Sequence, residues 1–165
     1  MRPPLFDISI YKNIDKYVFF SSTEDIRGFP VIIEPPLKLD LPSVGQIGIF
    51  TKQGIQISQS NPLTKYVDNY LSSLKKATKL GSLASIGSIW KVINIICNIK
   101  SDWIVPAHTI KSGYTISPVK FRNGAYRGYK QDPDYYLPLT ATDEELGETI
   151  LKAFDVIETL PEEYV

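Results

Sequence analysis

Alternating apolar and polar residues predict β-strands over the first third of the chain. Three segments either alternate in this way or are rich in strand-forming residues: Phe6–Tyr11, Lys16–Phe20 and Phe29–Ile33. Pro35-Pro36 predicts the end of the third strand, because proline has no N–H to donate to a neighbouring strand. Gly45–Phe50 and Ile55–Ile57 flank the turn-like Lys52-Gln53-Gly54, so the two runs predict a hairpin.

The middle of the chain changes to a helical period. Asn61 is a good N-cap and Pro62 suits the first helical position, so we expect a helix from there to Gly81. Its apolar face would hold Leu63, Val67, Tyr70, Leu71 and Leu74. A second helix is expected from Ser85, and its apolar stripe would hold Ile86, Ile89, Trp90, Ile93, Ile96 and Cys97.

The last third returns to short strands and ends in a helix. Strands are expected at Trp103–Val105, Tyr114–Ile116, Val119–Phe121 and Ala125–Tyr129, the last two joined by an Asn123-Gly124 hairpin turn. Tyr135–Leu137 leads into the clearest helix. Thr142 and Glu145 have the spacing of a capping box, in which each side chain bonds the backbone N–H of the other. The buried face of this helix would hold Leu146, Ile150, Ala153, Phe154 and Ile157.

These elements predict one α+β domain over residues 1–165, with a mostly antiparallel sheet and about three helices. Apolar residues make up 43% of the sequence and charged residues 22%, which is ordinary for a globular domain. No apolar run reaches the roughly 18 residues that cross a bilayer, and Met1–Asp7 has no apolar signal core. The single cysteine fits a reducing compartment. We therefore expect a cytoplasmic protein with no membrane partner.

Charge is unevenly distributed along the chain, although the formal net charge is zero. Residues 41–120 contain nine Lys or Arg and two Asp or Glu, whereas residues 121–165 contain four and ten. The basic middle and the acidic end are either a binding polarity or two regions that face each other in the fold.

Residues that usually perform catalysis are scarce. His108 is the only histidine, and we expect it to have a structural role. Cys97 lies on the predicted apolar stripe, where a thiol is a small buried hydrophobe and not a nucleophile. One Cys and one His cannot form a typical zinc site, and no Gly-rich phosphate loop is present in the sequence. The sequence therefore predicts no catalytic centre, metal or cofactor.

Acidic residues form three groups, of which two have a structural explanation. Asp143–Glu145 fits helix capping, and Asp132 and Asp134 flank Pro133 in a turn. Glu24-Asp25 is the third group. A small hydrolase that uses Asp132 or Glu24 is the weaker alternative to a protein that is not an enzyme.

Aromatic and basic residues alternate in the segment Tyr126–Lys130. This pattern is typical of a β-hairpin edge, of a protein contact, and of surfaces that stack on nucleic-acid bases. The neutral net charge and the acidic residues that follow count against nucleic acid, which we do not expect as a partner.

Two stretches carry a resemblance to a known family. One runs from Gly28-Phe29-Pro30-Val31 through Pro35–Leu39 to Gly45. The other contains Tyr114–Pro118, the Gly-containing hairpin, Leu137-Pro138-Leu139 and Asp143-Glu144-Glu145-Leu146-Gly147 before the amphipathic helix. The sequence resembles immunity proteins of bacterial contact-dependent growth inhibition (CDI) systems. The resemblance implies a cytoplasmic protein that neutralises the C-terminal toxin domain delivered by a neighbouring cell, often a nuclease. It transfers no catalytic residue and no contact residue.

A partner-binding surface is predicted from composition. Nuclease surfaces are usually basic, so acidic residues near tyrosines are the expected contacts. These are Tyr126, Tyr129, Asp132, Asp134, Tyr135, Glu24 and Asp25. The alternative function is a small nucleic-acid-binding module that uses the basic middle segment.

Overall fold

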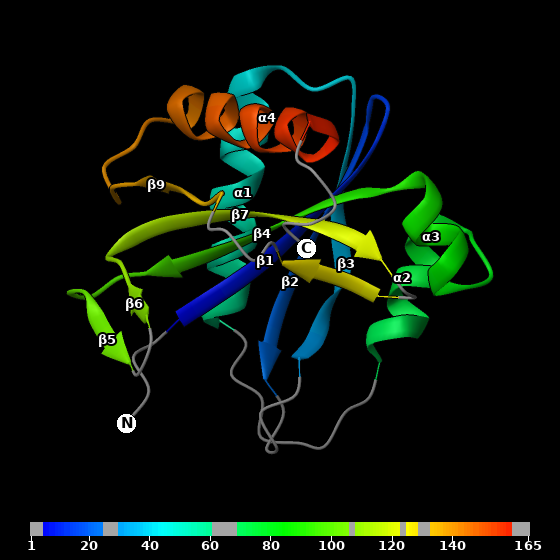
Figure 1. The fold of residues 1–165 in the computed structure, drawn as a ribbon, viewed down its shortest axis with the longest axis horizontal. Coiled ribbons are helices and arrows are strands. Elements are labelled where there is room, and N and C mark those ends of the chain that lie inside the picture. The colour runs from blue at the N-terminus through cyan, green and yellow to red at the C-terminus, as the bar shows by residue number, and fades with distance from the viewer. Residues whose placement is uncertain are drawn as a thin grey trace.

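The computed structural model describes residues 5–24, 30–60, 69–105, 108–122, 125–128 and 133–159. It confirms the expected α+β fold, with four helices in these ranges where about three were expected (Figure 1). The elements are β1 (Leu5–Asn13), β2 (Lys16–Glu24), β3 (Pro30–Asp40), α1 (Val44–Ser60), α2 (Tyr70–Thr78), α3 (Leu83–Ile89), β4 (Lys91–Asn98), β5 (Trp103–Val105), β6 (His108–Ile110), β7 (Gly113–Arg122), β8 (Ala125–Gly128), β9 (Tyr135–Leu137) and α4 (Asp143–Thr159).

One seven-stranded sheet organises the described chain. Its strand order is β3-β2-β1-β4-β7-β8, β9 also pairs with β7, and every pairing is antiparallel. Strands β5 and β6 form a separate two-stranded sheet. Figure 1 shows α1 and α4 crossing each other, with α2 and α3 grouped together at the right of the view.

The two faces of the sheet build two separate cores. On β1 and β2, Ile10 and Phe19 point into the core beneath α1 and α4, whereas Tyr11 and Phe20 point into the core beneath α2 and α3. This follows from the strand period of two, which sends neighbouring side chains to opposite faces. The helices therefore form layers on opposite sides of the sheet.

Residues 44–60 form helix α1, so the hairpin predicted there is wrong. Ser43 and Gln46 form a capping box: Gln46 N–H donates to Ser43 Oγ at 3.2 Å, and Ser43 N–H donates to Gln46 Oε1 at 2.8 Å. The buried face of α1 is helically spaced and consists of Ile47, Gly48, Thr51, Gly54, Ile55 and Ser58. The hydroxyl of the buried Ser58 has a hydrogen-bond partner in the sheet, because its Oγ donates to the Ser22 carbonyl at 2.6 Å. Tertiary contact with the sheet thus stabilises a helix whose residues locally suggest strands.

The second predicted helix is wrong beyond Ile89. Helix α3 ends there, Trp90 is extended, and the chain continues as β4. Ile93, Ile95 and Cys97 are buried with a period of two on the α1–α4 side of the sheet. The many β-branched residues favour a strand because β4 has a hydrogen-bonded neighbour on each side, β1 and β7.

Strand β3 continues through Pro35-Pro36, contrary to the predicted stop. It lies at one end of the strand order, and its pairing with β2 shifts register between Phe19 and Ser21, opposite this segment. Prolines are tolerated on an edge strand and at a bulge because neither requires their missing N–H. The edge is covered at Ile32, whose backbone N–H donates to Asn69 Oδ1 at 3.1 Å and whose carbonyl accepts from Asn69 Nδ2 at 2.8 Å.

The first middle helix and the strands of the last third were predicted in part. Helix α2 lies within the predicted first middle helix, whereas Asn61 and Pro62 fall outside the described residues. The strands predicted at Tyr114–Ile116 and Val119–Phe121 are one continuous strand, β7, which pairs with β8 as expected. The residues of the predicted turn, Asn123-Gly124, lie outside the described ranges.

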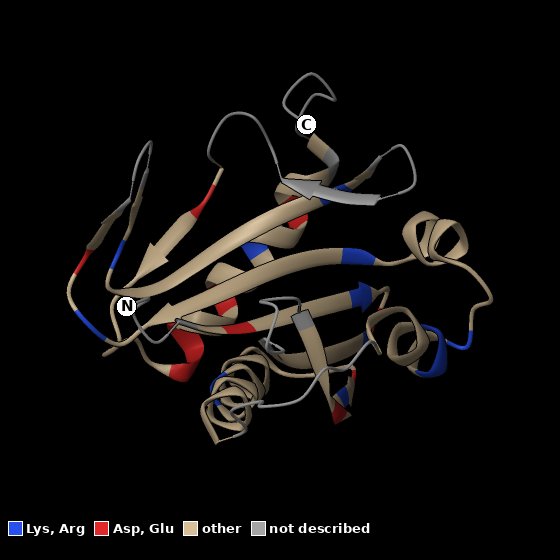
Figure 2. Cartoon of the chain, turned by 90° about the horizontal axis from the view of Figure 1, so that it is seen from below, with Lys and Arg blue, Asp and Glu red and all other residues tan. Residues whose placement is uncertain are grey.

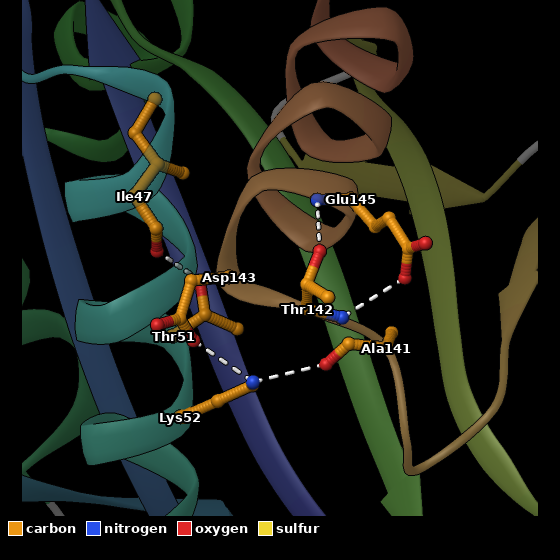
Figure 3. Close-up of polar contacts among 7 residues, drawn as sticks. All are labelled: Ile47, Thr51, Lys52, Ala141, Thr142, Asp143 and Glu145. Carbon is orange, nitrogen blue, oxygen red and sulfur yellow. Dashed lines mark hydrogen bonds and ion pairs between the residues drawn. The ribbon is translucent and has the colours of Figure 1, made fainter.

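The capping box of α4 is confirmed and lies against α1 (Figure 3). Glu145 N–H donates to Thr142 Oγ1 at 3.1 Å, and Thr142 N–H donates to Glu145 Oε2 at 2.9 Å. Lys52 of α1 reaches this turn, with its Nζ 2.8 Å from Asp143 Oδ1 and 3.0 Å from the Ala141 carbonyl. The five predicted core residues of α4 are all buried.

Candidate partner-binding surface

Of the residues predicted to contact a partner, those that the structure describes lie on two separate parts of the sheet. Tyr126 lies on β8, opposite Phe121, and Tyr135 lies on β9, opposite Ile116, so both are on strands that pair with the outer edge of β7. Glu24 ends β2, which β1 and β4 separate from β7. At a strand spacing of about 4.8 Å this separation is about 14 Å. The described members of the predicted set are therefore not brought together at one point.

Among the residues predicted to contact a partner, the side chains of Tyr135 and Asp134 are described, and neither is fully exposed. Tyr135 is half-buried and packs against the α1–α4 core, and Asp134, just before β9, is half-buried too. Asp25, Tyr129 and Asp132 lie outside the described residues. The side chains of Glu24 and Tyr126 are likewise not described.

A broad area of the sheet on the α2–α3 side lies beyond the two helices. Cross-strand pairing aligns its residues in two rows across the sheet. One row is Ser22–Asp7–Ile96–Thr115–Tyr136 and the other is Ser9–Asn94–Ser117. None of these eight residues is buried, and we call them the open sheet face. The next row, Val18–Tyr11–Val92–Val119, is buried in the core that includes α2 and α3.

A pocket of about 250 Å³ lies where the open sheet face meets α2. Its apolar lining includes Phe20, Ile32 and Leu74, and its polar rim includes Ser9, whose Oγ donates to Asn94 Oδ1 at 2.8 Å. The hydroxyl oxygens of Tyr11 and Tyr70, which also line it, are 3.3 Å apart. Apolar walls with hydroxyl and amide groups at the rim are suited to holding one large side chain of a protein partner.

Tyr136 is the exposed tyrosine of β9, and the sequence analysis missed it. Tyr136 is 40% exposed, and Lys111 Nζ lies 4.1 Å from the centroid of its ring. The strand period of two requires Tyr135 and Tyr136 to face opposite sides of the sheet. That signal is visible in the sequence, but only the packing of α4 decides which tyrosine faces outward.

Cys97 and His108, the pair considered as nucleophile and base, lie on different sheets. Cys97 is buried on β4, and burial raises the pKa of its thiol to about 11. His108 lies on β6, in the other sheet. Among the described residues, no group of three or more His, Cys, Asp or Glu side chains could hold a metal ion. No described helix is long and apolar enough to cross a membrane.

The basic middle segment is divided among several elements. Lys52 of α1 pairs with Asp143, and Lys76 of α2 lies 3.6 Å from Glu34. Figure 2 shows basic residues on α2, at one side of the molecule, and few charges on α1. Because α1 and α2 lie on opposite faces of the sheet, the segment does not form one continuous basic surface.

Comparisons with known proteins give matches to structures alone. No family model and no curated protein matches the sequence. The chain is similar in fold to a Neisseria meningitidis protein of unknown function, NMB0488, with 14% identity, a TM-score of 0.64, and coverage of 94% of this chain and 96% of that chain. It is also similar to a chain of the CdiA-CT/CdiI toxin and immunity complex from Yersinia pseudotuberculosis. There the identity is 15%, the TM-score 0.65, and the coverage 92% and 97%. The chain therefore shares its whole fold with these structures.

Proposed function

We propose that this chain is the immunity protein of a contact-dependent growth inhibition system, which binds and neutralises a cognate toxin domain in the cytoplasm. The observation that carries the proposal is the likeness in fold to a chain of a toxin and immunity complex over nearly the full length of both. The resemblance of Leu137–Leu139 and Asp143–Gly147 to the C-terminal pattern of immunity proteins supports the immunity role over the toxin role.

The proposed mechanism is steric, and the toxin is proposed to be a nuclease. A protein inhibitor needs no chemistry of its own if it covers the active site or the substrate surface of its target. The protonated, buried Cys97 and the separation of Cys97 and His108 between two sheets fit this mechanism. The purified chain should therefore cleave neither RNA nor DNA.

The open sheet face and its pocket are the proposed toxin-binding surface. Neighbouring strands are about 4.8 Å apart, so the row from Ser22 to Tyr136 spans roughly 19 Å. A face of that width can contribute much of the roughly 800 Å² per partner that a stable complex buries. Two of the residues predicted from composition lie near its margins in the chain: Glu24 is two residues after Ser22, at the end of β2, and Asp134 is two residues before Tyr136. Tyr135 faces the other side of the sheet.

The pocket is the proposed anchor point within this surface. Binding energy concentrates where one large side chain enters a desolvated pocket, and the surrounding contacts mainly exclude water. Asn94 is exposed at the rim, so Asn94→Phe should fill the pocket without disturbing the core.

Calorimetry tests the proposal with the C-terminal domain of the adhesin-like reading frame that we expect directly upstream of this gene. We expect the wild-type chain to bind and to block the toxin, and Asn94→Phe to weaken binding at least tenfold. Glu148→Phe, at an exposed position of α4, is the matched control and should bind normally. Absence of binding by the wild-type chain would refute the function. Normal binding by Asn94→Phe would refute only the placement of the surface.

A further inference from the structure

The outward side of α1 lacks the charges that solvent-facing helices usually carry. Five exposed residues occupy it with the spacing 3-4-3-4: Gln46, Ile49, Gln53, Gln56 and Ser60. We call them the α1 stripe. The one charged residue of α1, Lys52, is engaged by Asp143. Helix α4 has the same length and carries seven charged residues, whereas α1 carries one.

A groove with exposed apolar residues runs beside the α1 stripe. Ile49 is 42% exposed, Ile99 44% and Leu139 41%. All three line a hollow of about 400 Å³, to which Gln53, Gln56 and the paired Lys52 and Asp143 also contribute. A surface that combines exposed aliphatic side chains with few charges has the composition of an interface core. The groove therefore suits a second helix laid along α1.

We infer that a second copy of this chain packs on the α1 stripe, with the two α1 helices antiparallel about a twofold axis at Gln53. A 3-4 spacing places these five side chains in one line along the helix, against which a second helix can lie. In this arrangement Gln53 meets its own copy, Ile49 meets Gln56 of the copy, and Gln46 meets Ser60 of the copy.

Three properties favour a second copy as the occupant. Glutamine amides both donate and accept hydrogen bonds, so a glutamine stripe can pair with itself. The stripe is uncharged, so twofold symmetry brings no like charges together. Antiparallel helices also place the positive end of one helix dipole beside the negative end of the other.

The inferred dimer is compatible with the proposed function but does not depend on it. Helix α1 and the open sheet face lie on opposite sides of the sheet, so each copy in the dimer would keep its open face free. A 17-residue helix is about 25 Å long. A contact of that length is smaller than a standard interface, so we expect dissociation in the micromolar range.

Sedimentation equilibrium on the purified chain tests the inference. The wild-type chain should be a dimer at high micromolar concentration. Gln53→Lys and Gln53→Glu should each raise the dimer dissociation constant at least tenfold, because like charges would meet at the twofold axis. An equimolar mixture of the two variants should restore a dimer, since opposite charges then face each other. Glu148→Lys places a comparable change on α4 and should leave the dimer intact.

Several results would overturn the inference. They are a wild-type chain that stays monomeric at about 1 mM, single variants that dimerise normally, and a mixture that fails to recover. Circular dichroism establishes that each variant is folded. Toxin binding by the two Gln53 variants should equal that of the wild-type chain. A selective loss of toxin affinity would assign the α1 stripe to the toxin instead.

Discussion

At the scale of single residues, Thr142 decides how α4 begins. Its Oγ1 accepts from Glu145 N–H at 3.1 Å, which satisfies one of the donors left unpaired at a helix start. Thr142→Ala removes that acceptor and should lower the free energy of unfolding by about 1 kcal/mol. Chemical denaturation measures the change. Thr140→Ala, at a nearby exposed position, should have almost no effect, and equal stability of the two variants would mean that the cap contributes nothing.

Cys97 should make stability fall at alkaline pH. Burial raises the pKa of its thiol from the ordinary 9.0 to about 11, so between these values the folded chain holds a proton that the unfolded chain releases. The stabilisation is complete below pH 9 and is lost as pH rises toward 11. Burial also raises the pKa of Tyr17 and Tyr114, which adds to the fall at the upper end.

Urea denaturation between pH 7.5 and 10 checks this dependence. The wild-type chain should lose about 1 kcal/mol more than Cys97→Ala between pH 9 and pH 10. For each protein, only the change in the free energy of unfolding between the two pH values is used. The cost of the cavity that alanine leaves is the same at both pH values and therefore cancels. Parallel curves for the two proteins would contradict the assignment to Cys97.

At the scale of elements, two glycines set how closely α1 and α4 cross. A methyl group at Gly147 would overlap the carbonyl of Val44, and one at Gly48 would overlap the carbonyl of Asp143. Since backbone atoms cannot move aside as a flexible side chain can, Gly147→Ala should destabilise the fold by about 1–3 kcal/mol. Thermal unfolding measures the loss. Gly81→Ala has open space around the added methyl and should change stability by less than about 0.5 kcal/mol, so similar losses at both glycines would rule out this crossing geometry.

The elements that the sequence predicts are those whose signals are local. The spacing of Thr142 and Glu145 marks the start of α4, and strict alternation marks β1. Ser43 and Gln46 carry the same capping signal for α1, but the turn-like Lys52-Gln53-Gly54 suggested a hairpin. Strand β4 has the spacing of a helical stripe as well as of a strand. Its place between β1 and β7 decides between them, and that is a long-range contact which periodicity cannot supply.

The candidate surface could be predicted only in part for the same reason. Acidic residues near tyrosines are visible in the sequence, but Tyr135 faces the α1–α4 core and its neighbour Tyr136 is the tyrosine on the open sheet face. Four pairing registers decide whether one row forms from Ser22, Asp7, Ile96, Thr115 and Tyr136. Where α2 stops covering the sheet depends on tertiary packing.

At the scale of the whole molecule, the acidic residues near the C-terminus and the lysines of the middle segment can be tested separately for their role in binding a toxin or a nucleic acid. If the toxin is basic, Asp132→Lys together with Asp134→Lys should weaken its binding at least tenfold, or about 1.4 kcal/mol, because attraction becomes repulsion. Calorimetry with the toxin domain measures the loss. Asp134 is half-buried, so the melting temperature of the variant must be compared first.

Reversal of Lys75 and Lys76 to Glu on α2 is the contrasting change. It should leave toxin affinity nearly unaltered but would abolish binding in a protein that used its lysines to hold nucleic acid. Normal toxin binding by the aspartate variant, together with loss in the lysine variant, would move the interface to α2.

Asn69 bears on how strongly this protein resists aggregation at the concentrations of a cell. Its amide occupies the positions that an incoming strand would use at Ile32, on the edge of the sheet. Unprotected strand edges recruit other chains and start aggregation. Asn69→Ala should therefore increase light scattering during concentration and storage, whereas Asn69→Asp, which keeps one acceptor for the Ile32 N–H, should aggregate less than the alanine variant. An equal scattering rate in wild type and Asn69→Ala would show that other features keep this edge soluble.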